Sequence, residues 1–299
     1  MQKFNTQHSF SRRASLYIVL ALALLVTACS SLRLAYNNGD TLLYWWLDGY
    51  IDFDGEQKGE AKHDIDELFR WHRKTQLQDY VQVLQKAQAQ LQQGKVSRAD
   101  LLASYHDARN RTQALLLKAA PDIADMALTL HPEQLAQMER KFAKNNADFR
   151  KKNMKGDREQ QNKFRYKKSM DQFELWFGNF SSEQEAAIRR ASDARPLDNE
   201  IWLDERMRRQ RSILELAQRI SREQPSREQA IAWVQSLIRE SFARMDNSER
   251  KPFMDAYTNS TIDLVYTVVQ LATPAQKAHA HKRMQGWIDD FNTLAAQAK

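Results

Sequence analysis

The residue of this sequence with the most clearly indicated chemical role is a single cysteine. Cys29 is the only cysteine among 299 residues, and it follows the small residues Thr27 and Ala28. An apolar run over residues 16–26 precedes these residues and itself follows a basic start. A basic segment, a short apolar segment and small residues at a cleavage site are typical of a secretory signal peptide. The sequence therefore predicts that residues 1–28 are removed and that the thiol becomes the first side chain of the mature chain.

The segment Val26–Ser30 resembles the lipobox of bacterial lipoproteins. In those proteins the cysteine thiol receives a diacylglyceryl group, the chain is cut before the cysteine, and the new amine is acylated. The resemblance implies lipid attachment at Cys29, with palmitate among the acyl chains, and a lipoprotein whose body faces the periplasm. The apolar run is too short to span roughly 30 Å of hydrocarbon. Ser30, where Asp would retain a lipoprotein in the inner membrane, favours the outer membrane, and the inner membrane stays an alternative.

Carboxylates crowd residues 48–67, where eight acidic and two basic residues give a net charge of −6. Two carboxyls placed across a cleft can hydrolyse a glycosidic bond, so a cell-wall hydrolase is one hypothesis for this segment. The other interpretation is a solvated helix face that binds cations loosely. The sequence contains no phosphate-binding loop, nucleophile elbow or zinc-protease helix, and its seven histidines are scattered. We therefore expect no catalytic residues, no metal site and no cofactor.

Basic residues dominate residues 140–168, where twelve basic and three acidic residues give a net charge of +9. One interpretation is a charge-rich solvated helix. The other is a cationic arm for an anionic envelope polymer or protein partner. Export makes nucleic acid a poor partner, and no recognition motif for it occurs. The residues that we expect to contact the partner are Arg150, Lys151, Lys152, Lys155, Arg158, Lys163, Arg165, Lys167 and Lys168.

The elements that carry these residues are predicted to be helices. The chain has only eight glycines and six prolines, which indicates few turns and long helices. Apolar residues recur at spacings of three and four, and no period-two strand pattern is found. The spacing predicts one helix over 55–93, one very long helix over 132–177, and others near 98–120, 182–194, 198–222, 226–245, 248–271 and 274–297. The fold class is therefore all-α, an elongated helical bundle of long amphipathic helices behind a lipoprotein signal peptide.

We expect three parts in the chain. They are the signal peptide 1–28, a lipid anchor and aromatic anchor-proximal segment 29–52, and an all-α periplasmic domain 53–299, with a possible subdivision near 178–198. In the anchor-proximal segment Tyr44, Trp45, Trp46 and Tyr50 fit either a membrane interface or the core. We expect them in the core.

The predicted helix starts share one pattern, in which an apolar residue precedes a polar cap, an early Glu or Ala, and then Gln. Examples are Phe53–Gln57, Leu130–Gln134, Phe180–Gln184 and Leu271–Gln276. Helix capping explains the pattern, since Asp, Ser and Thr accept hydrogen bonds from free backbone N–H groups and Pro fits a first turn. The pattern also resembles the Leu-Thr-Pro-x-Gln signature of the Spy/CpxP group of periplasmic helical proteins. That resemblance implies a holdase chaperone as an alternative function.

A broader set of segments occurs together with the lipobox. They are Arg33–Asn38, Trp45–Asp48, Tyr50–Asp52, Trp71–Arg73, Trp176–Gly178, Arg206, Arg209, Gln210 and Thr273–Gln276. With these segments the chain resembles a family of uncharacterised proteobacterial lipoproteins that share a domain of unknown function. The resemblance implies a helical envelope lipoprotein and brings no catalytic residues. The leading function expected is non-enzymatic binding or scaffolding in the envelope, with the membrane as one partner through the N-terminal acyl chains.

Overall fold

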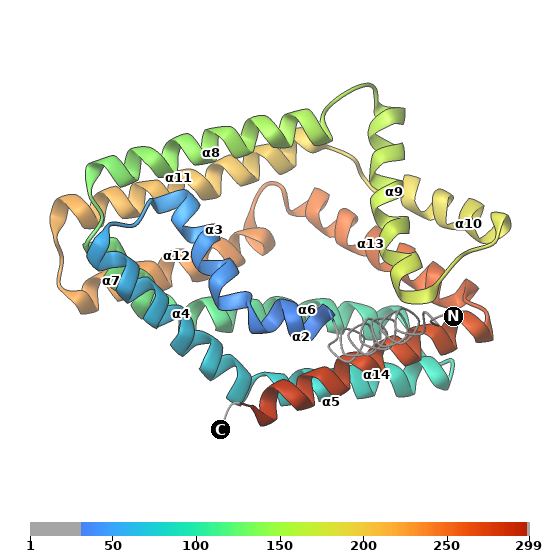
Figure 1. Ribbon diagram of the computed structural model, residues 1–299. Coiled ribbons are helices and arrows are strands. Elements are labelled where there is room, and N and C mark those ends of the chain that lie inside the picture. The colour runs from blue at the N-terminus through green and yellow to red at the C-terminus, as the bar shows by residue number, and fades with distance from the viewer. Residues whose placement is uncertain (1–30, 298–299) are drawn as a thin grey trace, which may run out of the picture.

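The computed structural model describes residues 31–297, and over this range the chain forms helices and loops without a β-strand (Figure 1). The all-α prediction is therefore confirmed. Cys29 and the predicted signal peptide lie outside the described residues. The helices are α2 (Ser31–Asn37), α3 (Gly39–Ile51), α4 (Gly55–Thr75), α5 (Leu77–Gln92), α6 (Arg98–Lys118), α7 (Ala120–Leu128), α8 (Pro132–Asn153), α9 (Arg158–Phe177), α10 (Ser182–Asp193), α11 (Asn199–Glu223), α12 (Arg227–Asn247), α13 (Lys251–Leu271) and α14 (Pro274–Ala296).

The helices are arranged as a frame (Figure 1). Helices α8 and α11 lie side by side along one edge, and α5 and α14 lie side by side along the opposite edge. One end of the frame is formed by α9, α10 and α13, and the other end by α4, α7 and α12. Helices α2 and α3 lie on the side nearest the viewer.

The apolar core is divided into clusters between neighbouring helices. Leu77 on α5 and Leu294 on α14 are fully buried in one cluster, and Leu32 and Tyr36 of α2 pack against it. In another cluster Ala120 and Ala124 of α7 let its backbone approach α11 and α12 closely. Burial of apolar surface in several such clusters stabilises each edge of the frame separately. The subdivision considered near 178–198 stays a prediction.

The single helix predicted over 55–93 is wrong, because α4 and α5 are separated by a bend at Gln76. This residue has φ −106° and ψ −33°, and backbone hydrogen bonds continue on both sides of it. The bend contains neither glycine nor proline. Helix α4 packs on α3, whereas α5 packs on α14. The different packing partners therefore account for the bend, and local sequence does not.

The single helix predicted over 132–177 is also wrong, because residues 154–157 separate α8 from α9. Gly156 has φ +79°, in the left-handed region that glycine adopts most readily. Asp157 caps α9, and its carboxylate accepts a hydrogen bond from Gln160 N at 2.8 Å. A glycine followed by an N-cap residue is a stop and start signal that the periodicity concealed. As a result α9 turns away from the direction of α8 (Figure 1).

The expectation that the anchor-proximal aromatic residues are in the core is correct for Tyr44 and wrong for two of its neighbours. Tyr44 is buried and packs with Phe53 against α4. Trp45 and Trp46 are 67% and 58% exposed. Tyr50 is half-buried, and its hydroxyl accepts a hydrogen bond from Asn145 Nδ2 at 2.7 Å. Helix α3 therefore presents aromatic side chains both to the core and to the outside.

Candidate functional site: a cationic corner between two helices

Eight of the nine basic residues predicted to contact a partner are exposed where α8 gives way to α9. Three lie in the last turn of α8, one lies in the connecting loop and four lie on α9. The turn at residues 154–157 brings the end of one helix and the start of the next together (Figure 1). We call this set the cationic corner, and it consists of Arg150, Lys151, Lys152, Lys155, Arg158, Lys163, Lys167 and Lys168.

The cationic corner lacks salt bridges within the described part of the chain. None of the ion pairs within residues 31–297 includes one of its members. The basic side chains in the last turn of α8 complement the negative end of its dipole. That explanation fails for Arg158, which begins α9 at its positive end. Lys163 and Lys167 are like charges four residues apart, a spacing that costs a few tenths of a kcal/mol.

Arg165, the ninth predicted residue, points away from this surface. Its guanidinium donates hydrogen bonds to the carbonyl oxygens of Ser192, Arg195 and Pro196 at 3.1, 3.0 and 2.7 Å. Burial lowers its pKa, and the nearby Arg195 guanidinium adds to the effect. Arg165 therefore holds the loop between α10 and α11 against α9, and this geometry favours a structural role over contact with a partner.

Buried polar contacts fix α8 against α11 beside the corner. Asn146 is buried and donates through Nδ2 to Gln210 Oε1 at 2.7 Å. Arg206 Nε donates to the Oδ1 of the same asparagine at 3.1 Å. Buried amides that satisfy each other specify one register between two helices, since a slip would leave them unpaired. Arg206 and Gln210, two of the residues that carry the family resemblance, therefore have a structural role between α8 and α11.

A shallow cavity lies beside the corner, between the loop after α8 and the start of α11. Its volume is about 320 Å³, and Arg158 lines it together with Met154 and Gln161. Asp198 and Glu200 line the other side. The cavity therefore combines both charges, whereas the exposed basic side chains outside it form no ion pair with the described residues.

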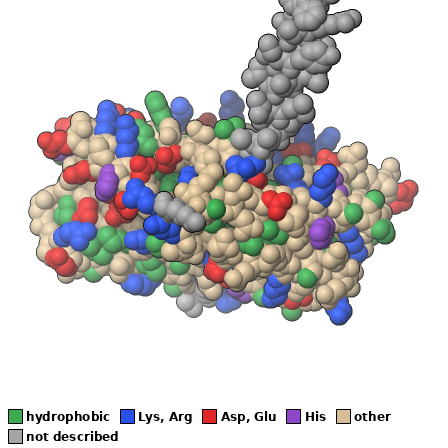
Figure 2. Space-filling view, turned by 60° about the horizontal axis from the view of Figure 1, so that its bottom comes forward, with side chains coloured by type: hydrophobic (Ala, Val, Ile, Leu, Met, Phe, Trp, Pro, Cys, Tyr) green, Lys and Arg blue, Asp and Glu red, His purple; other side chains and the backbone are tan. Residues whose placement is uncertain are grey.

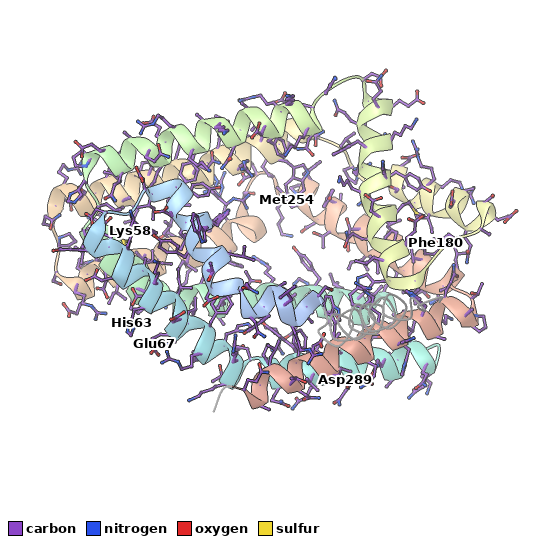
Figure 3. The ribbon with its side chains drawn as sticks, viewed as in Figure 1. Lys58, His63, Glu67, Phe180, Met254 and Asp289 are labelled. Carbon is purple, nitrogen blue, oxygen red and sulfur yellow. The ribbon has the colours of Figure 1, made fainter. Side chains whose placement is uncertain are left out.

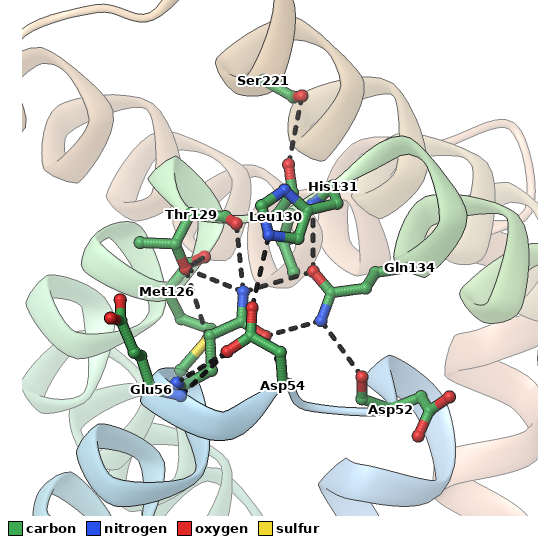
Figure 4. Close-up of polar contacts among 10 residues, drawn as sticks. Asp52, Asp54, Glu56, Met126, Thr129, Leu130, His131, Gln134 and Ser221 are labelled. Carbon is green, nitrogen blue, oxygen red and sulfur yellow. Dashed lines mark hydrogen bonds and ion pairs between the residues drawn. The ribbon is translucent and has the colours of Figure 1, made fainter.

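The start of α8 is positioned by a reciprocal contact between two capping glutamines (Figure 4). Gln57 Nε2 donates to Thr129 O at 3.0 Å, and Gln134 Nε2 donates to Asp52 O at 3.1 Å. Gln134 Nε2 also donates to Gln57 Oε1 at 2.6 Å. Each glutamine thus accepts from its own cap backbone and donates to the other cap. Two helix N-termini, of α4 and α8, are joined by their capping residues.

The same arrangement occurs a second time, between α10 and α14. Gln184 Nε2 donates to Leu271 O at 2.8 Å, and Gln276 Nε2 donates to Asn179 O at 2.7 Å. The two amides also bond each other, with Gln184 Nε2 donating to Gln276 Oε1 at 2.9 Å. The sequence pattern predicted the four helix starts. It did not reveal that they pair, and the glutamine at this cap position is not a sufficient signal, because Gln229 of α12 holds the same position without pairing.

One carboxylate of the acidic segment reaches a cavity. Asp66 lines a cavity of about 290 Å³ together with Asp40 of α3 and Arg73. Figure 3 places His63 and Glu67 along the outer side of α4, where both are exposed.

Another carboxylate of the segment, Asp64, faces α7 instead. Burial raises the pKa of Asp64, and the Asp122 carboxylate on α7 adds to this shift. Neither of these two side chains lines the cavity at Asp66 or the cavity beside the cationic corner. The raised pKa of Asp64 thus reflects a half-buried contact between α4 and α7.

Within residues 31–297 no cluster of three or more His, Cys, Asp or Glu side chains is arranged to hold a metal ion. Nor does any helix in this range combine the length and apolar composition that crossing a bilayer requires. On the face shown in Figure 2, basic and acidic side chains are interspersed.

Over the described residues the fold is all-helical, and the candidate site on its surface is the cationic corner. The chain belongs to a protein family of unknown function (DUF6279), which matches residues 49–241. The matched range includes both helices of the corner. The uncharacterised family predicted from the sequence is thus confirmed. Neither a curated protein nor a solved structure matches the chain.

Proposed function

We propose that this protein is a non-enzymatic binding or scaffolding lipoprotein of the bacterial envelope. Acyl chains on Cys29 hold it at the outer membrane, with the helical frame in the periplasm. The cationic corner binds an anionic envelope component, and the observation that carries this proposal is the set of eight exposed cations without a salt bridge. An anionic partner would relieve the repulsion between Lys163 and Lys167 and would explain why Arg158 begins α9.

The partner is best identified by crosslinking in living cells. A photo-crosslinking amino acid in place of Lys155 lies in the loop at the centre of the corner, where its exposed side chain leaves the helices undisturbed. One dominant adduct, whether protein, lipid or glycan, would support the proposal and name the partner. A smear of unrelated exported proteins would favour the holdase alternative. The absence of adducts would indicate that the cationic corner is only a solvated surface.

Charge reversal tests the electrostatic part of the proposal. Changing Lys151, Lys152 and Lys155 to Glu should weaken capture of the crosslinked partner at least about tenfold, because it shifts the corner by six charge units. Binding by the unchanged protein should also weaken with added salt, since exposed charges are screened. A matched control changes three exposed lysines elsewhere, namely Lys86, Lys95 and Lys282, to Glu. Equal loss in both variants would show a net-charge effect and refute a specific corner.

Two activity measurements separate the alternatives from binding. A holdase suppresses aggregation of an unrelated denatured protein at equimolar ratio without ATP, and a scaffold does not. A cell-wall hydrolase releases fragments from purified wall polymer, and a single change such as Asp64→Asn should abolish that release. Turnover of wall polymer by the pure protein would replace the scaffold proposal.

A further inference from the structure

Helix α3 has an outward apolar stripe that no other part of the described chain covers. Leu42, Trp45 and Trp46 are spaced at i, i+3 and i+4, so they lie on one face. Their exposed fractions are 59%, 67% and 58%, and Leu34 on α2 is 62% exposed. These are the largest exposures among the large hydrophobic side chains in the described range. We call Leu42, Trp45 and Trp46 the α3 stripe.

The opposite face of α3 already supplies the contacts that hold it in the fold. Leu43, Tyr44 and Leu47 pack with Phe53 and Ile65 in the cluster between α3 and α4. The α3 stripe is therefore not needed to seat the helix. A helix in a water-soluble body normally exposes polar side chains on its free face. Large aromatic side chains on that face instead mark a surface that meets something apolar.

Cationic side chains stand beside the stripe. The ammonium group of Lys141 on α8 lies 5.4 Å from the centre of the Tyr50 ring, and this ring contacts Trp46 with 4.8 Å between centroids. The ammonium of Lys62 on α4 lies 4.8 Å from the centre of the Tyr44 ring, and this ring lies 6.4 Å from the Trp45 ring between centroids. A tryptophan surface with lysines at its border suits the headgroup region of a bilayer, where indole rings concentrate and ammonium groups meet phosphates.

The position of the stripe in the chain identifies which surface it meets. Leu42 is 13 residues beyond Cys29, and residues 31–42 are helical except at Asn38. Helix at 1.5 Å per residue spans roughly 17 Å from Ser31 to Leu42, and two further residues reach at most about 7 Å, so the stripe lies within roughly 25 Å of the attachment point. Helices α2 and α3 also occupy one side of the frame together (Figure 1). A body tethered at Cys29 therefore keeps this side next to the bilayer.

We propose that the α3 stripe inserts into the headgroup–acyl boundary of the membrane that holds the lipid anchor. This inference rests on the acylation of Cys29 contained in the proposed function. Acyl chains fix a protein to a membrane without fixing its orientation, and a second apolar contact on the body supplies that orientation. The frame then lies with α2 and α3 against the bilayer, and Lys62 and Lys141 meet anionic headgroups beside them.

The test uses the full chain, purified in detergent and reconstituted into vesicles of phosphatidylcholine and phosphatidylglycerol with brominated acyl chains. Bromine quenches the fluorescence of tryptophans that reach the acyl boundary. We expect quenching of the unchanged protein and its loss in the variant with both Trp45→Phe and Trp46→Phe. A control with Trp202→Phe and Trp233→Phe removes two tryptophans from other helices and should leave the quenching in place. Absence of quenching in the unchanged protein would overturn the inference.

A variant without the acyl chains separates this inference from the proposed function. Full-length Cys29→Ser protein should still bind the same vesicles weakly, and changing Trp45 and Trp46 to Ala should reduce that binding about tenfold or more. The matched changes Ile123→Ala and Leu175→Ala remove exposed apolar side chains elsewhere and should have no such effect. If the unchanged protein carries no acyl chains but its α3 stripe is quenched, the proposed lipid anchor at Cys29 is wrong and the membrane contact of the α3 stripe is supported.

A second copy of the chain is the competing occupant of the stripe. In that case the detergent-solubilised protein would sediment as a dimer, and Trp45→Ala would convert it to a monomer. That result, together with no quenching by brominated lipid, would refute a membrane contact. A monomer whose stripe is quenched supports it.

Discussion

The paired capping glutamines lead to a sharp prediction about stability. Gln57 and Gln134 are 3% and 6% exposed, and their amides link the N-termini of α4 and α8. Replacing Gln57 by Leu keeps the approximate volume and removes every polar contact of that side chain. The change leaves unpaired the backbone N–H of Asp54, the carbonyl of Thr129 and one side of the Gln134 amide.

The expected cost follows from these lost partners. Loss of a cap contact costs about 1 kcal/mol. Leaving a buried donor or acceptor without a partner costs about 1–3 kcal/mol, and water reaches some of the groups here. We therefore expect Gln57→Leu to lower the free energy of unfolding by about 3 kcal/mol. The measurement is urea unfolding monitored by far-UV circular dichroism, and the dependence of the unfolding free energy on urea concentration should be the same in each variant.

A matched control and a double-mutant cycle sharpen this test. Gln229 holds the same cap position in α12, but its side chain is exposed and forms no contact with another cap. Gln229→Leu should change the free energy of unfolding by no more than about 0.5 kcal/mol. Adding Gln134→Leu to Gln57→Leu should cost less than the sum of the single changes, because the two variants share the same orphaned groups. Equal costs for Gln57→Leu and Gln229→Leu, or strict additivity, would refute the reasoning.

Three further predictions concern buried polar side chains. Arg165→Met should lower the free energy of unfolding by about 2–3 kcal/mol, because three carbonyl oxygens of the α10–α11 loop lose their hydrogen-bond donor. The control Lys163→Met, at an exposed position, should change this free energy little. Urea unfolding measures both. Burial raises the pKa of Tyr36 from 10.0 to about 12, so its contribution to stability should be complete below pH 10 and decline as pH rises toward 12. Tyr36→Phe should reduce that decline in thermal melts, and burial of other tyrosines accounts for the part that remains. Burial lowers the pKa of His72 from 6.5, so the unfolded chain binds the proton at a higher pH than the folded chain does. Stability should therefore fall as pH drops below 6.5, and His72→Gln should weaken this pH dependence of stability. An unchanged pH dependence in the variant would contradict the prediction.

Much of the secondary structure could be predicted because its signals are local. The caps at Asp54, Ser181 and Thr273 are confirmed, since each side chain accepts from backbone N–H groups a few residues away. The break before α7 is likewise confirmed, with Pro121 in its first turn. The turn at Gly156 was also signalled locally, but the run of periodic and basic residues on both sides hid it.

The candidate site was predicted in its composition and not in its shape. Charge counts alone located the cationic segment. Whether a given cation faces solvent or a carbonyl depends on what packs opposite it, so Arg165 could not be distinguished from Lys163 by sequence. The exposure of Trp45 and Trp46 escaped prediction for the same reason, because aromatic side chains are common both in cores and at surfaces that bind apolar partners.

The sequence by itself determined the helices, most of their ends, the concentration of positive charge and the lone cysteine, because these depend on neighbours within a few residues. The tertiary structure alone decided the bend at Gln76, the pairing of capping glutamines across helices and the outward face of α3. Each of these depends on contacts between segments far apart in the chain. Burial and pairing of polar groups are properties of such contacts, and a linear pattern of residue types does not record which segments will meet.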